Sequence, residues 1–241
     1  MKPLTLRLLA VLSIFAFCSG CSDSGADGDG LGGAGGGGFG GAGGDGNVGP
    51  ISCSVPGGLF AQTVVDHAFG PGQDVGQDAF PGLVLGPPRG AGSGAGSTDQ
   101  VVSLGEGGFV VVAFGQSVIV DEAGPDFVVF ENPFLVGGEP ENPYAELGEV
   151  SVSQDGDEWF VFPCTTREYP YGACAGWHPV LANADDNDLD PTDPEVAGGD
   201  PFDLHDLGLD WARYVRVDDV PDERQLAFDL DAVAVVHPGC F

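Results

Sequence analysis

The sequence predicts an all-β fold, an antiparallel β-sandwich of jelly-roll type with long acidic loops. Residues 51–241 consist of short runs rich in β-branched and aromatic residues, separated by Gly, Pro, Asp and Asn. This pattern is typical of strands and turns. No window shows a sustained apolar period of 3.6 residues, and only 203–211 has the pattern of a short helix. Many short strands with little helix are characteristic of sandwiches and jelly rolls.

The expected strands follow one another along the whole of this segment. The run EVSVS at 149–153 alternates with a period of two, and Asp155-Gly156 then supplies a tight turn into 159–162. On the same criteria we predict strands at 62–65, 101–104, 109–114, 117–120, 127–130, 149–153, 159–162, 214–217 and 228–236. We interpret residues 51–241 as a single β-sandwich domain.

The first 20 residues have the features of an export signal. A short basic start precedes an apolar run at 8–17, too short for a bilayer, where about 20 residues are needed. The segment C-S-G-C that follows resembles the lipobox of bacterial lipoproteins, with Cys18 where that motif usually has an aliphatic residue. The resemblance implies that Cys21 is lipidated, and that Ser22 directs the protein to the outer membrane of a Gram-negative cell. Ordinary secretion with cleavage near Gly20 is the alternative.

Glycine dominates residues 22–50, which leaves almost no side-chain surface to bury. We expect 21–50 to be a lipidated cysteine followed by a flexible tether that holds the domain away from the membrane surface. Later segments are too short or too polar to cross a bilayer. The predicted membrane contact is therefore a lipid anchor at the cell surface.

The charge balance excludes several classes of protein. The chain has 37 Asp and Glu against 7 Lys and Arg, a formal net charge of −30, which repels phosphate backbones, so we expect no nucleic-acid partner. Lys2 is the only lysine, and neither H-E-x-x-H nor G-x-S-x-G occurs. We expect a protein without enzyme activity. Polysaccharide hydrolysis by two facing carboxylates is the alternative that the many acids leave open.

Four cysteines remain after export, and in an exported protein an even number indicates disulfides. Four cysteines allow three connectivities. We favour Cys53–Cys240, which would close the two ends of the domain, and Cys164–Cys174, which would staple one loop. A four-cysteine metal site is the weaker alternative, because the chain has no C-x-x-C pair.

Acidic residues are concentrated at 185–206, where nine carboxylates occur with no Lys or Arg. Oxygen ligands on a flexible loop suit Ca²⁺, which takes about six to eight of them. The EF-hand spacing is absent, and a solvated acidic loop is the alternative for 185–193. Asp200 and Asp203 are the better candidate ligands, because they alternate with Phe202 and Leu204, which have the pattern of buried residues.

Six stretches resemble, in the same order, a family of bacterial secreted cell-surface proteins and lipoproteins with a galactose-binding-like β-sandwich. They are VVSLGEGGFVVVAF from Val101, GPDFVVFEN at 124–132, EVSVSQDGDEW at 149–159, AGGDPFDLHDLGL at 197–209, ARYVRVDD at 212–219 and FDLDAVAVV at 228–236. The pieces V-S-x-D-G-x-x-W and A-R-Y-V-R-V are similar to discoidin-type jelly rolls. FDLDAV resembles the last strand of carbohydrate-binding modules that hold a structural Ca²⁺.

The resemblance implies further metal ligands. Asp231 would be the Ca²⁺ ligand of the final strand, with Asp229 on the same face if that strand is regular. The alternative is that one of the two caps or pairs with an arginine of the ARYVRVDD segment. Asp126 and Glu131 flank an apolar strand and would contribute oxygens from its ends.

Tyr169, Tyr171 and Trp177 lie in the turn-rich loop REYPYGACAGWHP, which the predicted Cys164–Cys174 bridge would pin. An exposed aromatic face stacks on the apolar side of a sugar ring, so these residues are candidates for glycan binding, with core packing as the alternative. We expect a lipid-anchored, Ca²⁺-stabilised module that binds a glycan or a surface protein. A structural or adhesive envelope protein without a small ligand is the alternative.

Overall fold

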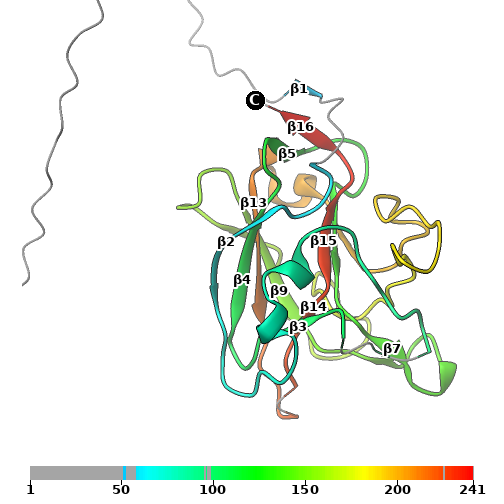
Figure 1. The fold of residues 1–241 in the computed structure, drawn as a ribbon. Coiled ribbons are helices and arrows are strands. Elements are labelled where there is room, and N and C mark those ends of the chain that lie inside the picture. The colour runs from blue at the N-terminus through cyan, green and yellow to red at the C-terminus, as the bar shows by residue number, and fades with distance from the viewer. Residues whose placement is uncertain (1–50, 53–57, 95, 97–98, 225, 241) are drawn as a thin grey trace, which may run out of the picture. The chain divides into compact units, whose positions relative to one another are not determined.

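Two antiparallel sheets pack face to face in the part of the chain that the computed structural model describes (Figure 1). The described residues are 51–52, 58–94, 96, 99–224 and 226–240, within one compact unit at Asn47–Phe241. The predicted signal at 1–20, the lipidated Cys21, the tether to residue 50 and Cys53 lie outside the described residues, and these features stay predictions. Within the described ranges, no helix has the length and apolarity needed to cross a membrane.

The larger sheet has five antiparallel strands. Their order across the sheet is β10 (Phe160–Val161), β9 (Gly148–Ser153), β13 (Tyr214–Asp219), β4 (Phe109–Ala113) and β2 (Thr63–Ala68). The central strand β13 pairs with β4 through Val215↔Val112 and with β9 through Val215↔Val152. Valines at these positions suit a pleated surface that is covered on one face.

The opposite side is built from smaller sheets. A three-stranded sheet has the order β11 (Asp200–Phe202), β6 (Phe127–Phe130) and β15 (Ala232–Val235), and a four-stranded sheet has the order β1 (Ile51–Ser52), β16 (Pro238–Cys240), β5 (Ser117–Val120) and β12 (Trp211–Ala212). Two strand pairs complete the fold, β14 (Asp229–Leu230) with β3 (Val102–Ser103) and β7 (Phe134–Leu135) with β8 (Pro143–Tyr144). Four short 3₁₀ turns connect strands: η1 (Gln77–Ala79), η2 (Gly82–Val84), η3 (Val136–Gly138) and η4 (Leu204–Leu207).

The core lies between the five-stranded and three-stranded sheets. Alternate residues of each strand face inward, as in Val110 and Val112 of β4, and they meet Phe127 and Val129 of β6. Each such fully buried side chain stabilises the fold by about 1.5–3 kcal/mol relative to an exposed one. The predicted all-β sandwich is confirmed.

The three-stranded sheet is covered on its outer face as well. Val128 and Phe130 of β6 pack against Val180 and Ala182, which precede the acid-rich segment, and against Ala197 within it. All four residues of β6 are buried for this reason. Its sequence FVVF is therefore continuously apolar instead of alternating.

Two predicted elements differ in detail from the structure. The predicted strand at 228–236 is divided at Asp231 into β14 and β15. The backbone N–H of Asp231 donates to the Phe130 carbonyl, and its carboxylate accepts from the backbone N–H of Arg89. The predicted short helix at 203–211 is the single 3₁₀ turn η4, which Asp203 caps by accepting from the His205 N–H. Gly208, at φ 66°, ends this turn in the left-handed conformation that favours glycine.

Candidate metal centre

Three carboxylates converge where the strands β6, β9 and β14 begin or end. Glu131 directly follows β6, Asp229 opens β14, and Glu146 lies two residues before β9. Carboxylate oxygens of all three lie within 4.8 Å of one another. Sequence reasoning predicted Glu131 and Asp229 as ligands and missed Glu146, which sits in an irregular segment and has no ligand-like spacing to either.

Strand register explains why Glu131 and Asp229 meet. Strands β6 and β15 are antiparallel, with Phe130 opposite Ala232, so Glu131 after β6 and the segment 229–231 before β15 leave the sheet at the same end. Glu146 is brought in by a close contact between Gly148 and Phe228. A Cβ at Gly148 would lie 2.6 Å from the Phe228 ring, so only glycine lets this ring pack there and draw the two segments together.

Glu131 is the most unusual member of the group. Its side chain is 1% exposed, and neither Oε1 nor Oε2 has a hydrogen-bond partner among the described residues. Burial, followed by the negative charges of Glu146 and Asp229, raises the Glu131 pKa well above its usual range, and the nearby backbone N–H of Asn132 offsets this only in part. A buried carboxylate without a partner costs several kcal/mol, so the site demands a proton or a cation.

The other two carboxylates, Glu146 and Asp229, also have raised pKa values and would likewise be stabilised by a proton or a cation. Burial and the charge of Asp229 raise the pKa of Glu146 to about 8, although the positive charge of Arg224 opposes the shift. Burial raises the pKa of Asp229 to about 6, against hydrogen bonds from Ser103 and Asn132. The donor set consists only of oxygens, which fits a hard divalent cation, and carboxylates that bind in bidentate fashion supply up to about six of the ligands that Ca²⁺ takes.

We expect the free energy of unfolding of the metal-free protein to fall as pH rises from about 4 to about 8. In the folded state the pKa of Glu146 is about 8 and that of Asp229 is about 6. At any pH between the unfolded pKa of each group and its folded pKa, the folded state binds more protons than the unfolded state does. Stability is therefore lost as pH rises through the folded pKa. Urea unfolding in EDTA at several pH values measures this slope. Glu146→Gln should flatten it, the exposed control Glu158→Gln should not, and stability that rises with pH between 5 and 8 would contradict the expectation.

A second acidic group contains Asp121, Asp126 and Asp203. Here the buried member is fully satisfied by the protein. Asp126 accepts at Oδ1 from the Glu122 N–H at 3.0 Å and bonds His237 Nδ1 at 2.8 Å, and at Oδ2 it accepts from the Leu204 N–H at 2.8 Å. This arrangement ties β6 to η4 and to the turn before β16, and it leaves no buried oxygen without a partner.

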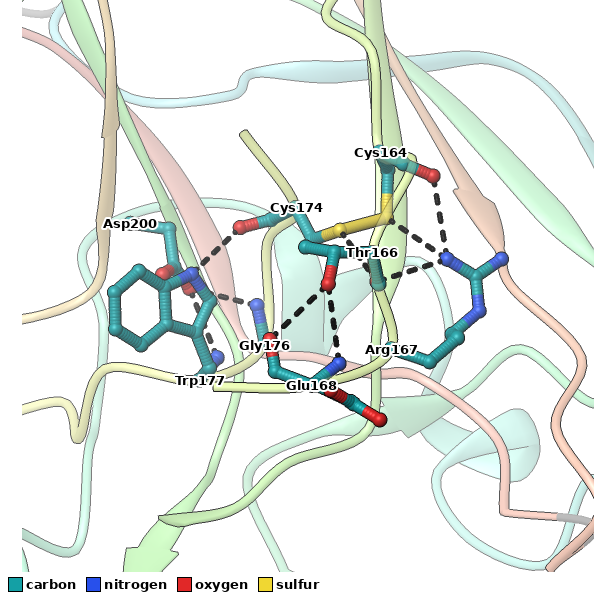
Figure 2. Close-up of a disulfide and its surroundings, with 8 residues drawn as sticks. All are labelled: Cys164, Thr166, Arg167, Glu168, Cys174, Gly176, Trp177 and Asp200. Atoms are coloured by element: carbon teal, nitrogen blue, oxygen red, sulfur yellow. Dashed lines mark hydrogen bonds between the residues drawn. A yellow bond between two sulfur atoms is a disulfide. The ribbon is translucent and has the colours of Figure 1, made fainter. Parts of the chain in front are cut away.

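Asp200 and Asp231 lie outside both groups. Figure 2 shows Asp200 beside Gly176 and Trp177, whose backbone N–H groups donate to its Oδ2 at 2.6 and 3.3 Å, and His178 Nδ1 lies 2.7 Å from its Oδ1. Asp231 accepts from the backbone N–H of Arg89 at 2.9 Å. Burial raises the pKa of Asp231 to about 7. Both carboxylates hold loops in place through protein donors.

The acid-rich segment is largely solvated at its tip. Asp185, Asp186, Asp188 and Asp190 are exposed, and none of them belongs to either acidic group of the described residues. Local bonds shape the segment, such as the Asp185 N–H donating to Asn183 Oδ1 at 2.8 Å. The exposed acids at 185–190 therefore do not coincide with the buried carboxylates, although Asp200 of the same segment is buried.

The predicted disulfide Cys164–Cys174 is confirmed, and its two cysteines are ten positions apart in the sequence (Figure 2). It closes the loop that carries Tyr169 and Tyr171. Cys240 also takes part in a disulfide, and Cys53, its predicted partner, lies outside the described residues.

The three predicted ligand-binding aromatics form one cluster next to this disulfide. Tyr169, Tyr171 and Trp177 have pairwise ring-centroid separations of 5.8 to 6.3 Å. The Trp177 indole N–H donates to the Cys174 carbonyl at 2.9 Å, and its ring lies 3.5 Å from that of His178. Tyr169 is the most accessible of the three, with 43% of the residue exposed. Trp177 thus stabilises the loop, and Tyr169 has the ring that is most accessible to a ligand.

Fold and site together define an acid-rich, disulfide-containing β-sandwich with a candidate centre for a divalent cation. Comparison with protein-family models and with curated proteins found no match for the chain. Its function is therefore inferred from the residues of the site.

Proposed function

We propose that the protein is a Ca²⁺-stabilised binding module without catalytic activity, anchored at the cell surface by lipid on Cys21. The observation that supports the cation is the buried carboxylate of Glu131, which lies near Glu146 and Asp229 and whose two oxygens have no hydrogen-bond partner among the described residues. Three carboxylates at this spacing repel one another, and a divalent cation between them removes both the repulsion and the missing contacts.

The chemistry of the donors favours Ca²⁺ over other cations. The group consists of carboxylates alone, without the His or Cys ligands that suit zinc and copper. Ca²⁺ accepts irregular geometry, whereas Mg²⁺ requires a near-ideal octahedron, and two of the three ligands, Glu131 and Glu146, come from segments outside regular strands. Ser103 and Asn132, which bond Asp229, would orient that ligand.

A cation at this position would act on the stability of the sandwich. Glu131 follows a strand of the three-stranded sheet and Glu146 precedes a strand of the five-stranded sheet, so one ion would join the two layers. A rigid scaffold of this kind supports loops that recognise ligands. The aromatic loop stapled by Cys164–Cys174 supports the proposal that the ligand is a glycan.

Calcium titration of the purified full-length protein tests the proposal. After treatment with EDTA, Ca²⁺ at about 100 times its Kd should stabilise the protein by about 2.7 kcal/mol and raise the Tm by about 5–10 °C. Calorimetry should find one ion at this site. The control is Na⁺ at equal ionic strength, which should leave the Tm unchanged. Absence of both heat and Tm shift with Ca²⁺ would overturn the proposal.

A further inference from the structure

A pocket of about 200 Å³ opens beside the candidate metal centre and shares one residue with it. Glu146 belongs both to the wall of this pocket and to the group of three carboxylates. Tyr171, Arg167 and Arg224 also line it, together with apolar residues such as Leu147. We call it the arginine pocket. It therefore contacts the aromatic loop through Tyr171 and the candidate metal centre through Glu146.

Two arginines in one small pocket are unexpected in this chain. The whole sequence has 7 Lys and Arg against 37 Asp and Glu. Yet Arg167 forms no ion pair with any carboxylate of the described residues, and it donates Nη1 to the carbonyls of Cys164 and Thr166 at 3.2 and 3.1 Å. A guanidinium held by neutral carbonyls keeps its full charge for another anion.

Both guanidinium groups are positioned before any ligand arrives. Figure 2 shows the Arg167 side chain directed towards Cys164. Arg167 lies in the loop that the Cys164–Cys174 disulfide closes, so the disulfide restrains its backbone. Arg224 donates Nε to Asp222 at 2.6 Å and Nη2 to the Ala145 carbonyl at 2.7 Å, which leaves its Nη1 without a partner in the described part of the chain. Preorganised groups lose little conformational entropy on binding, so they contribute more to affinity.

Size and lining identify the class of ligand. The pocket is smaller than the roughly 300–1,000 Å³ typical of sites for drug-sized molecules, so it takes a unit of about one sugar ring. Planar guanidinium groups match the planar carboxylate, and Tyr171 and Leu147 offer apolar surface to the C–H face of a ring. A second hollow of about 530 Å³ shares Arg167, Asp222 and Arg224 with this pocket and is also lined by Pro221 and Glu223. Further sugar units of a chain would lie there.

We propose that the arginine pocket binds a carboxylated sugar of an acidic glycan, with the carboxylate between Arg167 and Arg224. This inference deepens the proposed binding function by naming its ligand class and place. Glu146 and Asp222 face the same pocket and repel an anion, so the candidate cation on Glu146 would favour binding by neutralising that charge.

Calorimetry with digalacturonate tests the proposal on the full-length protein in Ca²⁺. We expect measurable binding to the wild type and none to the methyl ester of the same disaccharide, because the ester lacks the charge. Arg167→Gln and Arg224→Gln should each weaken binding about tenfold or more. Arg89→Gln is the matched control, since Arg89 pairs with Asp185 outside this pocket, and it should bind as the wild type does.

Several outcomes would overturn the proposal. These are equal binding of the ester, unchanged affinity of the two arginine variants, or no binding to the wild type. Inorganic phosphate that competes with equal affinity would reassign the pocket to anions in general and overturn the sugar assignment. The ester comparison uses only the wild type, so it decides the matter even where a variant fails to fold. A Ca²⁺-induced Tm shift without digalacturonate binding would reject the proposal for the pocket but not the metal centre. Digalacturonate binding without a Ca²⁺-induced Tm shift would reject the metal centre alone.

Discussion

Replacing Glu131 by Gln is expected to abolish the stabilisation of about 2.7 kcal/mol that Ca²⁺ confers at 100 times its Kd. The variant loses a buried ligand oxygen and one negative charge, while the volume of the side chain stays the same. The metal-free variant should in turn be more stable than the metal-free wild type at pH 8, because the amide needs no proton when it is buried. The two proteins should therefore exchange their order of stability when Ca²⁺ is added.

Thermal unfolding of both proteins in EDTA and in Ca²⁺ measures this exchange. Glu139→Gln, the same change at an exposed position, is the control and should keep the full Ca²⁺ shift of the wild type. A Glu131→Gln protein that still gains about 5–10 °C from Ca²⁺ would show that the cation binds elsewhere.

Asp126→Ala is expected to lower the free energy of unfolding by about 3–5 kcal/mol, or the Tm by about 6–20 °C. The substitution removes the acceptor of the Glu122 and Leu204 N–H groups and the partner of His237, and Leu204 is fully buried. Buried donors left without an acceptor each cost about 1–3 kcal/mol.

The Asp126 variant also separates the two acidic groups. Urea unfolding should show that Asp126→Asn, which keeps one carbonyl oxygen, loses less stability than Asp126→Ala. The Ca²⁺-induced shift should persist in both variants, since the cation is assigned to Glu131, Glu146 and Asp229. Loss of that shift together with the stability would instead place the ion at Asp121, Asp126 and Asp203.

Much of the fold follows from local pattern. The predicted strands 117–120 and 127–130 coincide with β5 and β6, because their β-branched and aromatic runs are bounded by turn residues. The pairing of Cys164 with Cys174 could be predicted because only a short loop separates the two cysteines in the sequence. The break between strands at Asp231 could not be predicted, because it depends on a backbone contact with Phe130, which is distant in the sequence.

The site was predicted only in part, for a similar reason. Glu131 was predicted as an acid at the end of an apolar strand, and Asp229 through the resemblance of FDLDAV to a calcium-binding strand. Asp126, Asp200 and Asp231 were predicted as ligands as well, but they use their oxygens for protein donors. Only tertiary packing distinguishes them. Glu146 joins the group through the contact of Gly148 with Phe228, and neither residue type signals a ligand.

The strand β6, covered on both faces, has a consequence for how this sequence can change in evolution. Every side chain of Phe127–Phe130 meets a packed neighbour, so this strand tolerates little substitution. The acid-rich segment is held to it by the small side chains Val180, Ala182 and Ala197, while its charged tip contacts mainly solvent. Such a segment can lengthen, shorten or exchange its acids with little effect on the core. We expect homologues to vary most where this chain carries the most charge.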